Sequence, residues 1–161
     1  MNIFILDENI EQCARYHCDR HLGKMVLEST QILCAALNKK GFETPYRCTH
    51  VKHPSVLRVE QSHDNFLWLL ALTSALNREF CCRHDRDKDQ ASIKVLRKIE
   101  GIKFDSAGLT PFPKAMPDIY KVEDDAVSAC RAFYIGDMSR FASWKKRETP
   151  EWFLQGLKEL F

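Results

Sequence analysis

The sequence predicts a mainly α fold, a single orthogonally packed helical domain of about six helices with at most one or two short strands. Apolar residues recur at intervals of three and four along most of the chain, which is the spacing of a helix with one buried face. The segments with this spacing differ in length, which favours orthogonal packing over a regular bundle. No repeat, low-complexity tract or linker divides the 161 residues, so we expect residues 1–161 to form one domain.

Composition and charge exclude several classes of protein. The chain is 45% hydrophobic and 29% charged, as in ordinary globular proteins, and its net charge of +2 is too small to indicate nucleic-acid binding by bulk electrostatics. No apolar run approaches the roughly 20 residues of a membrane span, so we expect no membrane partner. The first residues, MNIFILDEN, lack the basic start and long apolar centre of a signal peptide, which favours a cytoplasmic location.

The cysteines do not follow a disulfide or zinc-finger pattern. There are seven, an odd number, and none are spaced as C-x-x-C. Most fall where small core residues are expected. Cys18 is the exception, because it lies between His17 and Asp19 and could be reactive or bind a metal.

The first third of the chain predicts an apolar segment and two helices. Residues 2–6 (NIFIL) form a buried strand or an arm docked on the core. Asp7 is expected to cap a short helix that runs to about Arg15. A longer central helix follows and runs to about Asn38, with Gly41 just beyond it as a terminator.

Residues 16–31 (YHCDRHLGKMVLESTQ) carry the most informative polar pattern. His17, His21, Lys24, Glu28 and Gln31 recur at helical spacing and would share one face, beside an apolar face that points to the core. Imidazole is the side chain whose ordinary pKa lies closest to neutral pH. We therefore assign acid–base catalysis to His17, His21 and Glu28, and substrate binding to Lys24 and Gln31. A surface face with two incidental histidines is the alternative.

The start of this helix decides where His17 lies. Asp19 is a good N-cap residue, and a helix that begins there leaves His17 in the preceding turn. The first-turn amide groups would then face any anion bound beside Lys24.

A loop with two further histidines follows the central helix. Residues 42–54 contain two prolines and no helical period, which indicates a loop. His50 and His53 are three residues apart in it, and we expect the loop to pack over the polar helix face and add both histidines to the substrate-binding site.

The middle of the chain predicts the central buried helix and a charged segment. Ser62 is the expected N-cap of a strongly apolar helix over 62–82, with Asn65 in the third position of a capping box. Residues 83–88 (RHDRDK) are then either a solvated helix end or a phosphate-contacting loop that uses Arg83.

The last third predicts three helices separated by irregular segments. Helical spacing returns over 91–99 and 123–135, and Thr149 and Pro150 mark the start of a final helix. Residues 103–122 contain three prolines and cannot form one regular element. Residues 141–147 (FASWKKR) interleave aromatic rings with cations, so Trp144 and Lys145 are candidates for stacking on bases and contacting phosphates. A half-buried tryptophan beside solvated lysines is equally compatible with this segment.

The chemistry that the residues favour is metal-independent. Phosphate-binding glycine loops and nucleophile elbows are absent. We favour acid–base catalysis with no cofactor. Zinc binding is the alternative, and cysteine nucleophile chemistry at Cys18 is less favoured. A zinc ion would take its ligands from His17, His21, His50, His53 and Cys18.

Several motifs together resemble a family of small uncharacterised proteins common in bacteriophages and their hosts. The shared segments are YHCDRHLGKMVLES, THVKHP, SHDNFLWL, LTPFPKAMPD and TPEWF, in this order over most of the chain. Family members tend to have HCDKH, where this chain has Arg20 in place of the lysine, and they often have Trp where it has Leu57. The resemblance implies work on nucleotides or nucleic acid, such as DNA modification or repair, in the host cytoplasm.

Two functions of different classes follow. The first is an enzyme, a hydrolase or transferase, that acts on a nucleotide or nucleic acid at the polar helix face. The second is a non-catalytic module that binds nucleic acid or protein, with or without zinc, in phage–host interaction. Convergence of the polar side chains in one concave pocket favours the enzyme.

Overall fold

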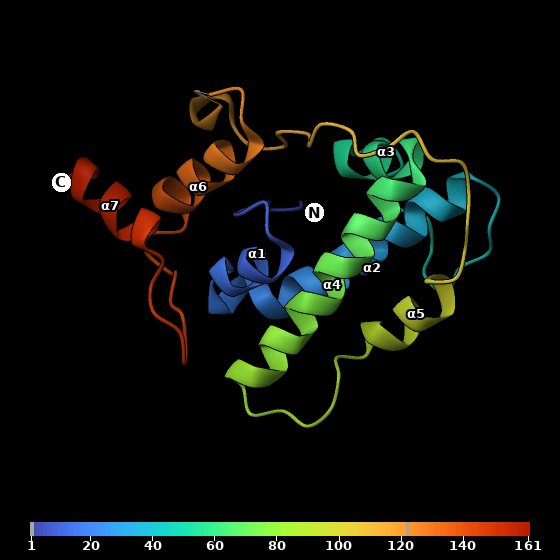
Figure 1. The fold of residues 1–161 in the computed structure, drawn as a ribbon, viewed down its shortest axis with the longest axis horizontal. Helices are drawn as coiled ribbons and strands as arrows, with labels where there is room; N and C mark the ends of the chain where they lie inside the picture. Colours follow the sequence, from blue (N-terminus) through green and yellow to red (C-terminus); the bar gives the residue numbers. More distant parts are fainter. Residues whose placement is uncertain (1, 122) are drawn as a thin grey trace.

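The computed structural model describes residues 2–121 and 123–161, and it confirms the mainly α fold (Figure 1). Within these residues there are seven α-helices, one short 3₁₀ helix and no strand. The helices are α1 (Ile10–Tyr16), α2 (Asp19–Lys39), α3 (Pro54–Gln61), α4 (His63–Arg83), α5 (Ser92–Ile99), η1 (Asp118–Tyr120), α6 (Ala126–Asp137) and α7 (Glu151–Leu160).

The two longest helices, α2 and α4, pack against each other at the centre of the fold (Figure 1). Apolar residues occupy most turns of both helices, and their contact forms the core. The side chain of Ser62 accepts a hydrogen bond from the amide of Asp64, which confirms Ser62 as the N-cap of α4. Helix α2 begins at Asp19 with Cys18 as its N-cap, so His17 lies before the helix.

The first residues form an extended arm and not a strand. Phe4, Ile5 and Leu6 are buried on the core, and none of the described segments pairs with their backbone as a strand. The expected cap at Asp7 is wrong. Asn9 caps α1 by accepting from the amide of Gln12, while the carboxylate of Asp7 accepts from the amide of Asn9.

The loop over 42–53 folds back on the C-terminal end of α2, away from His21 and Lys24. The side-chain amide of Asn38 donates to Thr44 and to the carbonyl of Tyr46. Lys39 donates to the carbonyl of Val51. The expectation that this loop covers the N-terminal half of α2 is therefore not met, because polar groups at the last turns of the helix hold it there.

The C-terminal third crosses back over the first half of the chain. The irregular segment between α5 and η1 passes along α3 and α4, and α6 and α7 then pack together beyond the N-terminal arm (Figure 1). Helix α6 begins after Asp125, whose carboxylate accepts two amide hydrogen bonds. Pro150, and not Thr149, occupies the N-cap position of α7.

Asn65 fixes the irregular segment to α4. It does not complete the expected capping box. Instead, its side-chain amide donates to the carbonyl of Arg58 at 2.7 Å and to the hydroxyl of Thr110 at 2.8 Å, and its oxygen accepts from the amide of Thr110 at 3.0 Å. Asn65 is fully buried, so these groups have no access to water as a substitute partner.

We expect Asn65→Ala to lower the free energy of unfolding by about 1–3 kcal/mol, because it leaves a backbone amide and a carbonyl without partners. Gln61→Ala is the matched control, since Gln61 also contacts the Thr110 hydroxyl but is exposed, and we expect it to cost less than about 0.5 kcal/mol. Urea unfolding of both variants measures the difference. Equal stabilities would contradict the assigned role of Asn65.

Candidate functional site

One pocket is lined by part of the predicted polar face of α2, namely His21, Lys24 and Glu28. It has a volume of about 350 Å³. It lies between the N-terminal half of α2, the extended arm, residues 115–117, and α6 with the residues that directly follow it. We call it the α2 pocket. It is lined by Asn2, Phe4, Arg20, His21, Lys24, Glu28, Ala115, Met116, Pro117, Phe133, Met138 and Phe141.

His17 does not belong to the α2 pocket. It is fully buried, and its Nδ1 lies 2.7 Å from the carbonyl oxygen of Cys13. Because a carbonyl only accepts, Nδ1 carries the proton and Nε2 is a bare acceptor, which has no hydrogen-bond partner in the described structure. Burial lowers the pKa of His17 to about 3. The proposed catalytic role of His17 therefore has no geometric support, because the ring is neutral and closed off from any ligand.

His21 lines the α2 pocket and is held in a fixed orientation. Its ring stacks on Phe4, with centroids 4.8 Å apart and planes 15° apart. Its Nδ1 is hydrogen-bonded to the hydroxyl of the buried Tyr134 at 2.7 Å. This bond leaves Nε2 as the nitrogen that can meet a ligand.

The protonation of His21 follows from its surroundings. Burial, together with the positive charges of Lys24 and Arg20, lowers its pKa to about 4. At neutral pH the ring is therefore a neutral imidazole. It can accept a proton or form hydrogen bonds, but it does not bring a positive charge to the pocket.

Lys24 and Glu28 form an ion pair on the same wall. Nζ of Lys24 lies 3.4 Å from Oε1 of Glu28. The lysine side chain is 62% exposed and the glutamate side chain 14% exposed, so the carboxylate sits deeper in the pocket. Its other oxygen, Oε2, accepts from the backbone amide of Asn2 at 3.3 Å. An exposed i, i+4 pair contributes only a few tenths of a kcal/mol, so stability alone does not explain this placement.

Arg20 and Phe141 complete the mouth of the α2 pocket. The guanidinium of Arg20 lies over the ring of Phe141, 4.8 Å from its centroid. Phe141 is 53% exposed, so one face of its ring is open to a ligand. Arg20 and Lys24 provide two positive charges against the one carboxylate of Glu28, so the mouth favours an anion.

Three of the predicted binding residues lie elsewhere. Gln31 is half-buried further along α2 and does not line the α2 pocket. His50 is exposed in the loop over 42–53, with a left-handed φ of 50°. His53 is the N-cap of α3, where its Nδ1 accepts from the amide of Ser55. The folding of this loop onto the C-terminal end of α2 keeps both histidines out of the pocket.

Arg83 is not a surface phosphate contact, because it is fully buried. Its guanidinium pairs with Glu79 at 2.8 Å and with Asp19 at 3.1 Å. It also donates to the backbone carbonyls of His17 and Arg15. Each of its three guanidinium nitrogens already donates within the core, and no part of the side chain reaches the surface.

Trp144 and Lys145 also make hydrogen bonds that stabilise the fold. The indole nitrogen of the buried Trp144 donates to the carbonyl of Tyr16 at 2.9 Å. The backbone amide of Lys145 donates to the carboxylate of Asp19, which leaves its exposed ammonium free to contact solvent. Trp144 therefore cannot stack on a base, and of the two residues only the Lys145 ammonium lies at the surface.

Sequence reasoning missed Arg20, Phe141 and Tyr134. Arg20 is four residues before Lys24, so the helical spacing already placed it beside that face. Phe141 lies in the aromatic–cationic segment over 141–147, but the interpretation there chose Trp144. No pattern in the sequence around Tyr134 indicated its role, because its contact with His21 joins residues 113 positions apart.

The possible zinc ligands are divided between several places. Cys18 is buried, and burial raises its pKa, so the thiol is protonated and not a ready ligand or nucleophile. His17 faces the core, while His50 and His53 lie in the loop. In the part of the chain that the structure describes, no three histidine, cysteine or acidic side chains are grouped as metal ligands. All seven cysteines are free thiols.

Comparisons with known proteins do not add an identity to this geometry. No protein-family model matches the chain, and the searches of curated proteins and of solved structures return no match either. None of the described helices combines the length and the apolar character that a membrane crossing requires.

Proposed function

We propose that the α2 pocket binds a nucleotide, free or as a unit of a nucleic acid, and that His21 and Glu28 perform metal-independent acid–base chemistry on it. The observation that carries this proposal is the meeting of two cations, an exposed aromatic ring, a neutral imidazole and a carboxylate in one pocket of about 350 Å³. This volume lies in the usual range for small-molecule sites.

Each part of a nucleotide has a complementary group in the pocket. Arg20 and Lys24, one helical turn apart at its mouth, suit the phosphate. The exposed ring of Phe141 suits a stacked base, and the arginine above it would add a second planar surface. The sugar would then lie over the floor, near His21 and Glu28.

The chemistry follows from the state of these two side chains. His21 is neutral, and with its Nδ1–H donating to the Tyr134 hydroxyl oxygen it would act as a proton acceptor through Nε2. Glu28 is held from both sides by Lys24 and the Asn2 amide, and it would orient or deprotonate an attacking group. Such a pair of groups suits a hydrolase or transferase reaction, in which one group removes a proton and the other orients the attacking group. The resemblance of the chain to phage proteins supports a nucleotide or nucleic-acid substrate.

We expect Lys24→Ala and Arg20→Ala to weaken binding of a nucleotide or short oligonucleotide at least tenfold each, about 1.4 kcal/mol, because each removes a phosphate contact. Lys94→Ala on α5 is the matched control, since Lys94 is also an exposed helical lysine but lies outside the pocket. Isothermal titration of the four proteins against a panel of nucleotides and single strands measures the affinities.

An activity assay of the same ligand panel, run beside the titration, separates an enzyme from a binding module. His21→Gln should retain most of the affinity and lose turnover, because the amide cannot accept a proton as imidazole does. Binding without turnover of any panel member by the wild type would favour the non-catalytic module. Equal affinities of the wild type, Lys24→Ala and Arg20→Ala for every ligand bound would refute the α2 pocket as the binding site.

A further inference from the structure

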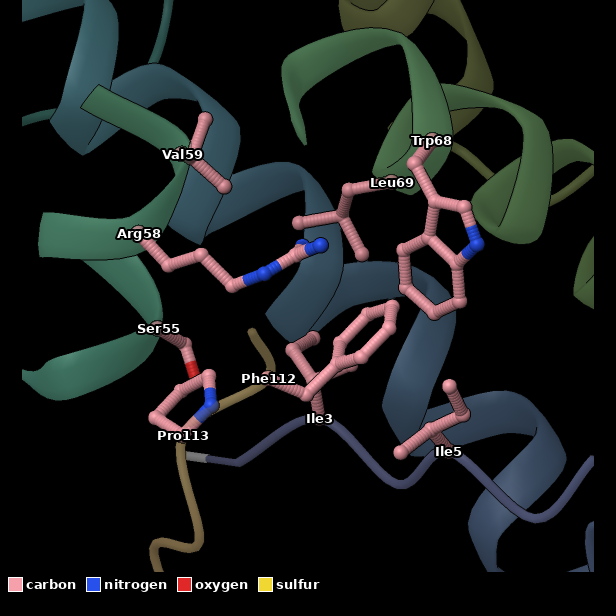
Figure 2. Close-up of a pocket in the computed structure, with 9 residues that line it drawn as sticks. All are labelled: Ile3, Ile5, Ser55, Arg58, Val59, Trp68, Leu69, Phe112 and Pro113. Carbon is pink, nitrogen blue, oxygen red and sulfur yellow. The ribbon is translucent and has the colours of Figure 1, made fainter. Parts of the chain in front are cut away.

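The two buried arginines are held by groups of the chain and lie out of reach of a large anion. Arg83 pairs with two carboxylates in the core. Arg58 donates to the carbonyl of Thr110 at 3.1 Å, and its guanidinium lies 3.8 Å from the centroid of the Phe112 ring. The cavity beside Arg58 has a volume of about 10 Å³, the space of one water molecule (Figure 2). A large anionic ligand therefore meets only the exposed cations.

A second open pocket lies beside the turn that joins α1 to α2. Its volume is about 460 Å³, and we call it the α1 pocket. The end of α1 forms one wall, and the segment that leads into α7 forms the other. Three cations and two carboxylates line it, so its net charge is positive. The lining residues are Gln12, Arg15, Tyr16, Lys146, Arg147, Glu148, Thr149, Pro150 and Glu151.

Residues 141–147 connect the α2 pocket to the α1 pocket. Phe141 lines the first pocket, and Lys146 lines the second. Between them the segment is fixed to the start of α2, because the backbone amide of Lys145 donates to both carboxylate oxygens of Asp19, at 3.0 and 2.9 Å. The five residue steps from Phe141 to Lys146 span at most about 18 Å. A chain of a few nucleotides is long enough to occupy both pockets.

The surface between the two pockets carries cations that the fold leaves free for a ligand. Lys145 and Arg15 are exposed, and no carboxylate of the described residues forms an ion pair with either side chain. Lys146 pairs with Asp85, but both side chains are exposed, so this pair contributes little and can be exchanged for a phosphate. We call these cations, together with the two at the mouth of the α2 pocket, the basic strip: Arg15, Arg20, Lys24, Lys145 and Lys146.

We propose that the basic strip binds the backbone of single-stranded nucleic acid, with one nucleotide in the α2 pocket and the adjoining phosphates on Lys145, Lys146 and Arg15. This inference rests on the proposed function, and it narrows the ligand from a nucleotide in general to a unit of a strand. Cations that follow the backbone, with aromatic rings for the bases, are the usual means of binding single strands. Phe141 and Tyr16 place one ring in each pocket.

The structure favours a single strand over a duplex. The α2 pocket has a volume of about 350 Å³, so it has room for one nucleotide and not for a base pair within a helix. A paired base would have to leave its stack before it could enter, which costs a few kcal/mol. A patch of cations without a pocket behaves in the opposite way, because a duplex carries the higher density of phosphate charge.

The first test compares ligands on the wild-type protein. Fluorescence anisotropy of a labelled hexanucleotide, with unlabelled competitors, gives the affinities for the hexamer, for the mononucleotide of the same base and for a duplex of the same sequence. We expect the hexamer to bind at least tenfold more tightly than either competitor. DNA and RNA hexamers are both titrated, because they share the backbone phosphates, and the tighter one identifies the natural strand.

Three results of this comparison would overturn the basic strip. They are equal affinities for the hexamer and the mononucleotide, tighter binding of the duplex, and no binding of any strand. Equal affinities would leave the proposed function in place, since the α2 pocket would then bind a free nucleotide. The failure of this inference is therefore distinguishable from the failure of the proposed function.

The second test uses variants of the strip. Lys145→Ala and Arg15→Ala should each weaken hexamer binding at least threefold, lower the salt dependence of log K by about 0.7 and leave mononucleotide binding unchanged. Both variants should fold, because the backbone and not the side chain makes the hydrogen bonds to Asp19 and Arg83. An unchanged Tm verifies this.

Two further variants complete the comparison. Lys24→Ala should weaken binding of the hexamer and of the mononucleotide, whereas Lys158→Ala, at an exposed lysine of α7, is the matched control and should change neither. Hexamer affinity that is unchanged in both Lys145→Ala and Arg15→Ala would overturn the basic strip. Losses in these two variants with none in Lys24→Ala would support the strip and refute the α2 pocket as the nucleotide site.

Discussion

The protein is expected to lose about 4 kcal/mol of stability between pH 7 and pH 5, because two buried histidines resist protonation. The pKa is about 3 for His17 and about 4 for His21, against 6.5 in an unfolded chain. Between these values the unfolded chain binds protons that the folded protein excludes, so acid favours unfolding. About one pH unit above 6.5, both states are neutral at these rings and the effect vanishes. Below about pH 4 it levels off, because His21 begins to take up its proton in the folded state.

Urea unfolding at pH 7, 6 and 5 measures this dependence, in a range above the usual pKa of carboxylates. Near pH 5.5 the two histidines should give a slope of about 2.4 kcal/mol per pH unit, which corresponds to nearly two protons. His21→Phe should roughly halve the slope, and His50→Gln, at an exposed histidine, should leave it unchanged. A slope that is the same in His21→Phe as in the wild type would show that His21 titrates normally.

The helices could be predicted from local signals because their apolar spacing and caps lie close together in the sequence. Ser62 stands directly before the apolar run of α4, and its hydroxyl caps the helix as expected. At α1 two good cap residues stand two positions apart, Asp7 and Asn9. Asn9 is the cap, while the carboxylate of Asp7 pairs with Arg131 of α6, which lies far along the chain. Such a contact leaves no local pattern.

The candidate site could be predicted in part. His21, Lys24 and Glu28 share a pocket because they lie on one continuous helix. His17 fits the same spacing, but the helix is interrupted at Cys18, and the interruption turns the ring into the core. A spacing argument holds only while the helix is unbroken.

The assignments of Trp144 and Arg83 as binding residues failed because each side chain contacts a group far away in the sequence. In the segment 141–147 the structure exposes Phe141 and buries Trp144, since the indole nitrogen of Trp144 finds the carbonyl of Tyr16. The charged segment that begins at Arg83 predicted that this arginine is exposed. Asp19, 64 positions away in the sequence, pairs with its guanidinium, and this opposite charge makes a buried position possible. Charge predicts exposure only where no such partner exists.

Arg83→Met should lower the free energy of unfolding by about 3–5 kcal/mol, the usual effect of removing one partner from a buried ionic network. The guanidinium joins α4 to the turn between α1 and α2, through Asp19 and the carbonyls of Arg15 and His17. Methionine fills much of the volume but leaves the two carbonyls without their donor and Glu79 with Arg147 as its remaining partner.

Arg78→Met is the matched control for this substitution. Arg78 lies on the same helix and pairs with Glu11, but both side chains are 61% exposed. We expect this variant to lose less than about 1 kcal/mol, because exposed ion pairs contribute little. Chemical unfolding of both variants is measured at pH 7.5, where His17 and His21 are neutral in the folded and the unfolded state. The losses in Arg83→Met and Arg78→Met then contain no contribution from these histidines. Similar losses in Arg83→Met and Arg78→Met would mean that the Arg83 network does not hold the α1–α2 turn, because a buried connector must cost more to remove than a surface pair.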